Sequence, residues 1–290
     1  MSLLKRSPCK VNLLLNILGK RSDGFHELET LMHPVRLFDE LTFKTSGGGI
    51  ELTCSEPGLP VDNQNLVYRA AKAFLETSGL GRGVRIHLEK HIPLAAGLGG
   101  GSGNAATTLL ALNELFGMPL AGETLFRLAC TLGSDVPFFL QGNPALASGR
   151  GERIESLGPF AALKGAAFLL VHPGFGISTA WAYQQLQRYP EALNGKPGRA
   201  RKLAALLHQS NLEAAASEFY NSLEAPALEK YPLLAIFQDF FRENGATGTL
   251  MSGSGSTTFA VTSTVNAAED LREKFRAKFS PTVWTAVTEA

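Results

Sequence analysis

The stretch IPLAAGLGGGSGNAA, residues 92–106, decides how the rest of the chain is interpreted. It holds five glycines within seven residues and runs into the alanine- and leucine-rich segment NAATTLLALNELF, residues 104–116. This segment predicts a helix that Gly117 and Pro119 end. Glycines let a backbone approach a ligand closely, and a helix start offers unpaired amides and the positive end of its dipole. We therefore expect a phosphate group at this glycine loop, defined as residues 97–104.

Two simpler interpretations of the glycine loop are weaker. A flexible Gly/Ser linker is not normally framed by a strand-like run (VRIHLEK, residues 84–90) and a strong helix. A Walker-type loop ends in Gly-Lys-Ser/Thr, whereas the Gly-Lys pairs of this chain are followed by Arg21 and Pro197.

A dinucleotide fingerprint can be placed on Gly101, Gly103 and Ala106. That motif needs a tight turn directly after a parallel strand, and residues 93–97 lengthen the turn. It also needs an acidic residue closing a following strand about twenty residues on, where residues 120–124 predict a helix start instead. We infer a nucleotide-phosphate loop of another kind, and a dehydrogenase ranks last among the possible functions.

Length, charge and cysteine content bound the class of protein. The chain has 290 residues, with 44% hydrophobic and 18% charged content, which suits two ordinary domains with sizeable cores. A net charge of +1 gives no electrostatic case for binding nucleic acid or an anionic membrane. No run predicts a transmembrane helix or a signal peptide. Because Cys9, Cys54 and Cys130 are odd in number and widely spaced, we expect free thiols and a cytoplasmic protein.

The order of the predicted elements indicates two α+β domains, at residues 1–160 and 161–290. In the first we expect strands at 9–18, 50–54, 84–90 and 133–140, an extended stretch ending near Phe43, helices at 66–77, 104–116 and 121–132, and a hairpin turned at 149–151. In the second we expect strands at 166–172, 247–252, 257–262 and 282–286, and helices at 179–187, within 200–220, at 227–243 and at 266–279. The second series approximates the β-α-β-β-α-β unit of ferredoxin-like folds.

Lys10 and Asp135 are the residues best suited to catalysis. Lys10 lies inside an apolar strand, with Asn12 on the same face two positions later. A lysine there is costly unless it has an anionic partner or a ligand, although an exposed strand face is an equal alternative. Asp135 stands at the entrance to the apolar run VPFF, where it could also be only a turn former. If the two meet, the ammonium keeps the carboxylate ionised as a base and offsets charge on a phosphoryl group.

Three further loops could contact a ligand. The segment LMSGSGSTTF, residues 250–259, has more hydroxyls and backbone donors than a simple hairpin needs, and could close over a phosphate. HPGFGIST (residues 172–179) and DGFHELET (residues 23–30) each place a ring in a glycine-containing loop. Phe25 could stack on a base and His26 could bond to its polar edge, against the alternative of a core Phe beside an exposed His.

Together these pieces resemble the GHMP kinase superfamily, named for galactokinase, homoserine, mevalonate and phosphomevalonate kinases. The resemblance lies in CKVNLLLNILGKRSDGFHELETL (residues 9–31), IPLAAGLGGGSGNAA, LGSDVPFFLQG and SGSGSTTF, which occur in the family's order. It implies a two-domain α+β fold, with a left-handed β-α-β crossover in the first domain and a ferredoxin-like second domain. The first segment is most similar to the branch whose acceptor is a cytidine-diphosphate-linked sugar alcohol.

The resemblance also implies an ATP-dependent transfer to the acceptor's 2-hydroxyl, with Mg²⁺ carried in by ATP. Lys10 and Asp135 would be the catalytic pair. The acceptor side would comprise Asn12, Phe25, His26, Thr179, Tyr183, Gly253, Ser254 and Gly255. The ATP side would comprise Asn65, Leu66, Lys90, Pro93, Gly97, Leu98, Gly99, Gly100, Gly101, Ser102, Gly103 and Asn104.

Two positions depart from the family's pattern. Phe25 stands where many members have Tyr, which keeps the stacking face and loses a hydroxyl. Gly103 follows Ser102 where a Ser-Ser pair is common, so no protein ligand is assigned to the metal. Another small alcohol acceptor is the main alternative, and a non-catalytic nucleotide-binding module is a second. Phe25, His26 and Tyr183 disfavour the first and the Lys10–Asp135 combination disfavours the second. The oligomeric state is left open.

Overall fold

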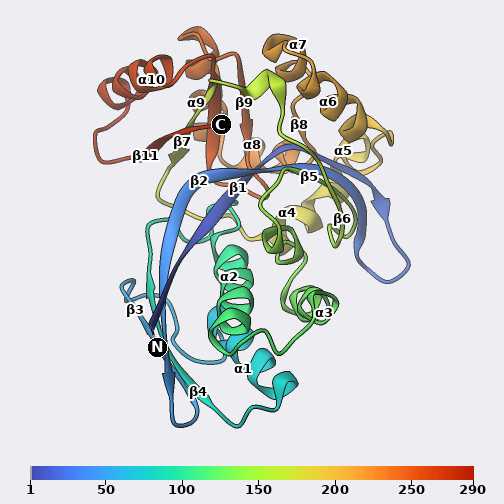
Figure 1. Cartoon of the computed structure of the whole chain (residues 1–290). Helices are drawn as coiled ribbons and strands as arrows, with labels where there is room; N and C mark the ends of the chain where they lie inside the picture. Colours follow the sequence, from blue (N-terminus) through green and yellow to red (C-terminus); the bar gives the residue numbers. More distant parts are fainter. Residues whose placement is uncertain (1) are drawn as a thin grey trace. The chain divides into compact units, whose positions relative to one another are not determined.

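The computed structural model describes residues 2–290, and the chain divides into two compact units that interleave in sequence (Figure 1). Among the described residues, unit 1 comprises residues 2–9, Leu37–Pro93 and Gly99–Gly142. Unit 2 comprises Lys10–Arg36, Leu94–Leu98 and Asn143–Ala290. The chain therefore passes from one unit to the other inside its first two strands and inside the glycine loop. The domain boundary expected near residue 160 stays a prediction.

The larger sheet contains seven strands in the order β3-β4-β2-β1-β8, with β5 on β2 and β6 on β5. Its strands are β1 (Ser2–Lys20), β2 (His26–Ser46), β3 (Ile50–Cys54), β4 (Gly83–Glu89), β5 (Ala145–Gly149), β6 (Arg153–Ser156) and β8 (Tyr220–Asn221). The first strand is thus much longer than the predicted residues 9–18. β3 and β4 are neighbouring parallel strands joined through a helix, which makes a β-α-β connection. The left hand of the crossover stays a prediction.

Three helices of unit 1 pack on one another: α1 (Leu66–Ser78), α2 (Gly100–Leu115) and α3 (Gly122–Leu132) (Figure 1). On α1 the buried residues are Val67, Ala70, Ala71 and Phe74, the spacing of one helical face. α2 begins at Gly100 rather than at the predicted Asn104, so the last glycines of the loop already have helical backbone.

Two predicted elements are wrong. Residues 133–140 form no strand; the chain turns after Gly133 and makes a 3₁₀ helix, η1 (Pro137–Leu140). Pro137 presets its own φ for such a turn, and a short buried apolar run has no periodicity that separates strand from helix. The single helix expected at 227–243 is two, α8 (Glu224–Lys230) and α9 (Pro232–Glu243). Pro232 disfavours helical backbone at Tyr231, which has φ −125° and ψ 72°.

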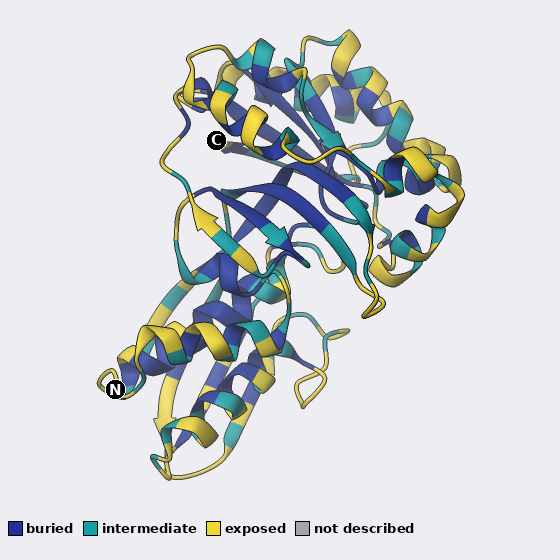
Figure 2. Ribbon diagram, turned by 90° about the vertical axis from the view of Figure 1, so that its right-hand side faces the viewer, coloured by how far each residue is buried: buried dark blue, intermediate teal, exposed yellow. Residues whose placement is uncertain are grey.

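The second sheet, in unit 2, has the order β11-β7-β10-β9 with every neighbouring pair antiparallel. Its strands are β7 (Ala167–His172), β9 (Gly248–Met251), β10 (Thr258–Thr262) and β11 (Trp284–Glu289), and α9 and α10 (Val265–Lys278) pack against them. β7 and β10 are buried at every position, while the exposed residues follow the outer faces of the helices (Figure 2). This arrangement confirms the predicted ferredoxin-like unit.

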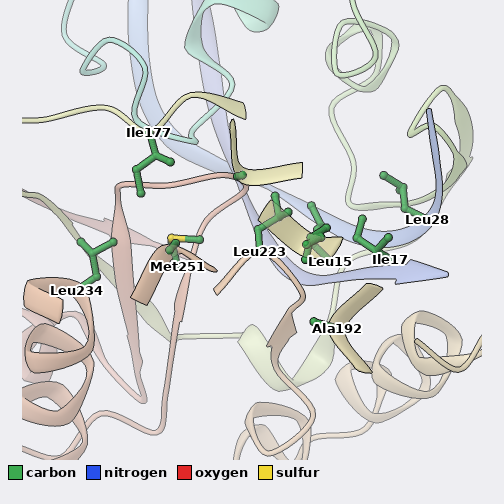
Figure 3. Close-up of a cluster of buried hydrophobic side chains, with 11 residues drawn as sticks. Leu15, Ile17, Leu28, Ile177, Ala192, Leu223, Leu234 and Met251 are labelled. Atoms are coloured by element: carbon green, nitrogen blue, oxygen red, sulfur yellow. The ribbon is translucent and has the colours of Figure 1, made fainter. Parts of the chain in front are cut away.

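A helical segment of unit 2 connects β7 to β8. It contains α4 (Thr179–Gln185), η3 (Leu186–Arg188), α5 (Pro190–Leu193), α6 (Arg199–His208) and α7 (Leu212–Ala216), and a further turn, η2 (Ala161–Leu163), precedes β7. An apolar cluster takes residues from α4 and α8 and includes Leu15, Leu28 and Met251 (Figure 3). Throughout residues 2–290, the helices are too short or too polar to cross a lipid bilayer.

Candidate active site

Lys10 is buried in β1, and two neutral oxygen atoms are among its hydrogen-bond partners. It is 2% exposed, and its ammonium bonds to Asn12 Oδ1 and to the Gly97 carbonyl oxygen at 3.0 Å. Asn12 Nδ2 in turn donates to Thr30 Oγ1 at 2.8 Å, on β2. The sequence left two equal alternatives for Lys10, an exposed strand face or a buried one. The structure shows the buried face.

The turn SGSG, residues 252–255, lies directly against this lysine. A Cβ added at Gly253 would stand 3.2 Å from Lys10 Nζ and 3.4 Å from Asn12 Oδ1. Ser252 Oγ donates to the Gly97 carbonyl oxygen at 3.0 Å and accepts from the Asn12 amide at 3.3 Å. The structure therefore brings the SGSG turn, the start of the glycine loop and Lys10 into one cluster within unit 2.

The close approach of the glycine loop to the SGSG turn requires a glycine at position 97. Its φ is +76°, and an added Cβ would meet the Ser252 carbonyl oxygen at 2.1 Å, a distance no side chain could accept. Leu98 follows in the same unit, is buried, and its carbonyl oxygen accepts from the Lys10 amide at 2.9 Å. The first residues of the loop thus form contacts with β1 and the SGSG turn.

The remaining loop residues, 99–104, form the N-cap and the first residues of α2 in unit 1. Gly99 is the N-cap, no side chain caps the helix, and its first turn holds no acidic residue. The amides of Gly100, Gly101 and Ser102 are therefore the start of a 16-residue helix with the orphan donors and positive dipole end that bind phosphate. Such a set of donors fits a nucleotide phosphate.

A buried ionic network supports that helix start. Lys90 Nζ is bonded to Asp39 Oδ2, and their side chains are 6% and 0% exposed. Asp39 also accepts from Asn104 Nδ2 at 2.9 Å and from the His91 and Ile92 amides at 2.8 and 2.9 Å. These hydrogen bonds give Lys90 and Asn104 a structural role. Both residues were expected on the ATP side, and their contact with ATP stays a prediction.

Close packing against β1 explains why residue 103 is a glycine. A Cβ there would stand 2.5 Å from the Pro8 carbonyl oxygen and 3.0 Å from Ser7 Oγ, on β1. A serine in this backbone would require β1 to move away from α2. Ser7 itself is fully buried and accepts from Asn104 Nδ2 at 3.0 Å.

Asn65 caps α1, since its Oδ1 accepts from the Val67 amide at 2.9 Å and its Nδ2 donates to the Pro60 carbonyl oxygen at 2.7 Å. Leu66 is the first residue of that helix and Cδ1 of its side chain lies 3.6 Å from a Cβ position at Gly101. Pro93 is half-buried just before the loop. All three lie in unit 1 with the helix start of α2, and their role in binding adenine stays a prediction.

Two of the residues expected on the acceptor side, His26 and Tyr183, are neighbours in unit 2. The rings of His26 and Tyr183 have centroids 5.1 Å apart and an interplanar angle of 39°. His26 Nε2 is buried without a hydrogen-bond partner among residues 2–290. Burial, helped by the charge of Lys20, lowers the pKa of His26, so the imidazole is neutral at pH 7. An unsatisfied polar atom beside a ring fits recognition of a base edge.

Phe25 lies at the tip of the turn between β1 and β2, 52% exposed. The guanidinium of Arg150, from the turn between β5 and β6, lies 4.5 Å from the centre of its ring. The turn is fixed by Arg21, which pairs with Asp23 and Glu27 and thereby lowers the pKa of the Asp23 carboxyl. An exposed ring on a turn that carries two ion pairs is suited to stacking.

Thr179 begins α4, and its hydroxyl is hydrogen-bonded to Ser254 Oγ at 2.8 Å. Tyr183 lies one helical turn further along α4. The acceptor-side residues of this segment and of the SGSG turn are therefore linked. Gly255 packs tightly too, because an added Cβ would lie 2.6 Å from Met251 Sδ.

Asp135 is half-buried in unit 1, between the end of α3 and η1, not at a strand entrance as predicted. Its pairing with Lys10, which belongs to unit 2, stays a prediction. No three His, Cys, Asp or Glu side chains among residues 2–290 are grouped so as to hold a metal ion.

Sequence reasoning missed three residues that hold these clusters: Asp39, Asn221 and Glu224. Asn221 donates to the carbonyl oxygens of Met251 and Gly253 at 2.7 and 2.8 Å. Glu224 Oε1 accepts from the Met251 amide at 2.7 Å, and burial raises the pKa of this carboxyl. No local pattern marks any of the three, since each partner is distant in sequence.

Comparison with known proteins identifies two matching family models and a set of similar kinases. The family model for the GHMP kinases N terminal domain matches residues 65–143, and the model for GHMP kinases C terminal matches residues 191–281. A 4-diphosphocytidyl-2-C-methyl-D-erythritol kinase from Syntrophus aciditrophicus (strain SB) is 44% identical over 260 residues, 88% of this chain and 88% of the relative.

Solved structures agree as well. A crystal structure of 4-(cytidine 5'-diphospho)-2C-methyl-D-erythritol kinase matches with a TM-score of 0.83 and 36% identity, covering 99% of this chain and 100% of that one. A homoserine kinase from Cytophaga hutchinsonii matches with a TM-score of 0.75 at 22% identity, over 99% and 93% of the two chains, and shows the common fold alone. The chain belongs to the GHMP kinases and, within them, to the 4-diphosphocytidyl-2-C-methyl-D-erythritol kinase family.

Proposed function

We propose that this chain transfers the γ-phosphoryl group of ATP to the 2-hydroxyl of 4-diphosphocytidyl-2-C-methyl-D-erythritol. The products are the 2-phosphate and ADP, a step of the methylerythritol phosphate route to isoprenoids and terpenoids. The observation that carries this proposal is 44% identity to a kinase of that name over 88% of both chains. The unpartnered His26 Nε2 beside the Tyr183 ring supports the cytidine acceptor over mevalonate or homoserine.

In this proposal each polar cluster has one role. The amides at the start of α2 and the glycine loop hold the ATP phosphates, and Mg²⁺ enters bound to ATP. His26, Phe25 and Tyr183 bind the cytosine, while Asn12, Thr179 and the SGSG turn contact the remainder of the acceptor. The 2-hydroxyl oxygen attacks the γ-phosphorus as the bond to the bridging oxygen of ADP breaks. The hydroxyl proton passes to the Asp135 carboxylate, and the Lys10 ammonium offsets charge on the transferred group.

One assay tests the assignment. Protein, ATP, Mg²⁺ and the cytidyl-diphosphate acceptor are mixed, ADP release is followed, and phosphorus NMR locates the new phosphate. We expect phosphate on the 2-oxygen and poor turnover of mevalonate and homoserine. Absence of turnover, or equal turnover of the three alcohols, would contradict the proposal.

The proposed base is tested with Asp135→Asn. We expect kcat to fall by about 10²–10⁴-fold because the amide cannot take the hydroxyl proton. ATP binding, measured by calorimetry, should be retained. A variant that keeps wild-type kcat would leave transfer to positioning and charge alone.

A further inference from the structure

One short segment, residues 221–224, forms hydrogen bonds to the backbone of the SGSG turn (residues 252–255) and of the residue before it. Asn221 Nδ2 donates to the carbonyl oxygens of Met251 and Gly253 at 2.7 and 2.8 Å. Glu224 Oε1 accepts from the Met251 amide at 2.7 Å. Both polar groups of the Met251 backbone are thus bound by side chains of this segment, at the point where β9 ends and the turn begins.

The same segment is attached to the strand that carries Lys10. β8 pairs with β1 in parallel, with Leu15 opposite Asn221. The Ser222 amide donates to the Leu15 carbonyl oxygen at 2.8 Å, and Ser222 Oγ accepts from the Ile17 amide at 3.0 Å. Residues 221 and 222 therefore hold β1 on one side and the SGSG turn on the other.

Asn221, which links the segment to the turn, is buried and uses both polar groups of its side chain in hydrogen bonds. Asn221 is 2% exposed, and its Oδ1 accepts from the Leu223 amide at 2.9 Å. Leu223 and Met251 pack together with Leu15 and Leu234 in one apolar cluster (Figure 3). A buried amide with all its groups bonded holds its partners in one geometry, and losing a donor leaves carbonyl oxygens unsatisfied.

We propose that Asn221, supported by Glu224, is a positioning residue that sets the SGSG turn against the Lys10 ammonium. The inference rests on the proposed function, because it assigns the turn to the acceptor side of that site. A Cβ at Gly253 would stand 3.2 Å from Lys10 Nζ, so a small shift of the turn changes the space beside the ammonium. Misplacement of reacting groups by about 1 Å costs about 100-fold in rate.

The test compares Asn221→Asp with a matched control, Asn113→Asp. Asn113 is also 2% exposed, its Nδ2 donates to the Leu120 carbonyl oxygen at 3.0 Å, and its Oδ1 accepts from the Leu120 amide at 2.9 Å. It lies in α2 of unit 1 and outside both proposed substrate sides. Each substitution removes the donors of a buried amide and keeps the acceptor, so both should lower stability to urea.

Only Asn221→Asp should alter catalysis. We expect kcat/KM for the acceptor to fall by about 10- to 100-fold, with kcat lowered and the acceptor KM raised, while the KM for ATP stays unchanged. Asn113→Asp should keep wild-type values of all three. Equal kinetics for the two variants would overturn the proposal. If Asn221→Asp does not fold, Asn221→Ser, which keeps one donor, is measured against the same control and the same criterion.

A second readout does not depend on the acceptor. In ¹⁵N-glycine-labelled protein without substrate, the amide resonances of Gly253 and Gly255 should shift in Asn221→Asp and remain in place in Asn113→Asp. Unchanged resonances in both variants would overturn the positioning role even if the kinase assay succeeds. If wild type fails to phosphorylate the cytidyl acceptor, the proposed function falls, while the glycine resonances still decide this inference.

Discussion

Two lysines, Lys90 in unit 1 and Lys10 in unit 2, are both buried but belong to clusters of different kinds. Lys90 is bonded to Asp39, whose carboxylate is fully buried and also accepts from two backbone amides and from Asn104. Lys10 donates to a side-chain amide oxygen and a backbone carbonyl oxygen, beside two glycine turns.

We propose that this difference distinguishes a lysine that supports the fold from one that acts on a substrate. In the Lys90 network the ammonium and the carboxylate satisfy each other, which suits a role in holding the start of α2. In unit 2 the neighbourhood of Lys10 includes glycines with no side chains, and the acceptor-side cluster has the unpartnered His26 Nε2. An unsatisfied buried atom is costly in a folded chain, and in the proposed function a bound cytosine edge would satisfy His26 Nε2.

The largest expected effect is on stability, in Lys90→Met. Removal of the ammonium leaves the Asp39 carboxylate buried without its counter-charge, which should cost about 3–5 kcal/mol of unfolding free energy in urea. The double variant Asp39→Asn/Lys90→Met removes both charges and should recover part of that loss. A single variant within about 1 kcal/mol of wild type would break the comparison, because Lys90 would then not be a scaffold residue.

The next effect is on rate, in Lys10→Met. Methionine fills a similar volume without the charge, so kcat should fall by about 10²–10³-fold, as for loss of one transition-state donor. Circular dichroism and ATP affinity serve as controls and should remain close to wild type. Retention of kcat would place Lys10 with Lys90, among the structural lysines.

A third measurement sharpens the account of His26. Its pKa is lowered by burial and by Lys20, so the ring stays neutral at pH values above its ordinary value of 6.5 and gains its proton only below it. The acceptor KM should therefore be flat above pH 6.5 and rise in more acidic solution by up to about tenfold per pH unit. His26→Gln keeps a polar edge and cannot titrate, so its KM should lose this rise. A rise that persists in His26→Gln belongs to another group.

The smallest effect concerns Arg150, whose guanidinium lies over the exposed ring of Phe25. Arg150→Met keeps an aliphatic stem and removes a cation–π contact of about 0.5–1 kcal/mol. The acceptor KM should rise about two- to fivefold with ATP KM unchanged. A larger change would mean that Arg150 contacts the acceptor directly.

The sequence alone predicted the elements that are determined by short local patterns. The glycine loop, its helix and the β-α-β-β-α-β order of unit 2 each follow from spacing, composition and turn residues. Pro232 was also visible, and the break it causes between α8 and α9 could have been predicted from the restriction on Tyr231.

What the sequence could not give depends on distant partners. Asp39 lies in the segment LFDEL, where a solvated acid is the ordinary expectation, and its lysine is 51 positions away. Asn221 bonds to carbonyl oxygens 30 and 32 positions away, with no motif around it. The departure at Gly103 was visible, but its reason, the Pro8 carbonyl oxygen, required the packing of β1 on α2.

The interleaving of the two units has a consequence for synthesis on the ribosome. Residues 10–36 emerge early, yet the partners of β1 in unit 2 include Tyr220 and Asn221, and those of Asn12 include Ser252. The segment that carries Lys10 can pair with β2 early, but its contacts with β8 and with the SGSG turn must wait for more than two hundred later residues. Pairings of such long sequence separation are slow and leave apolar strands uncovered meanwhile. Expression at reduced temperature, or with added chaperones, should raise the yield of folded enzyme without any change in its sequence.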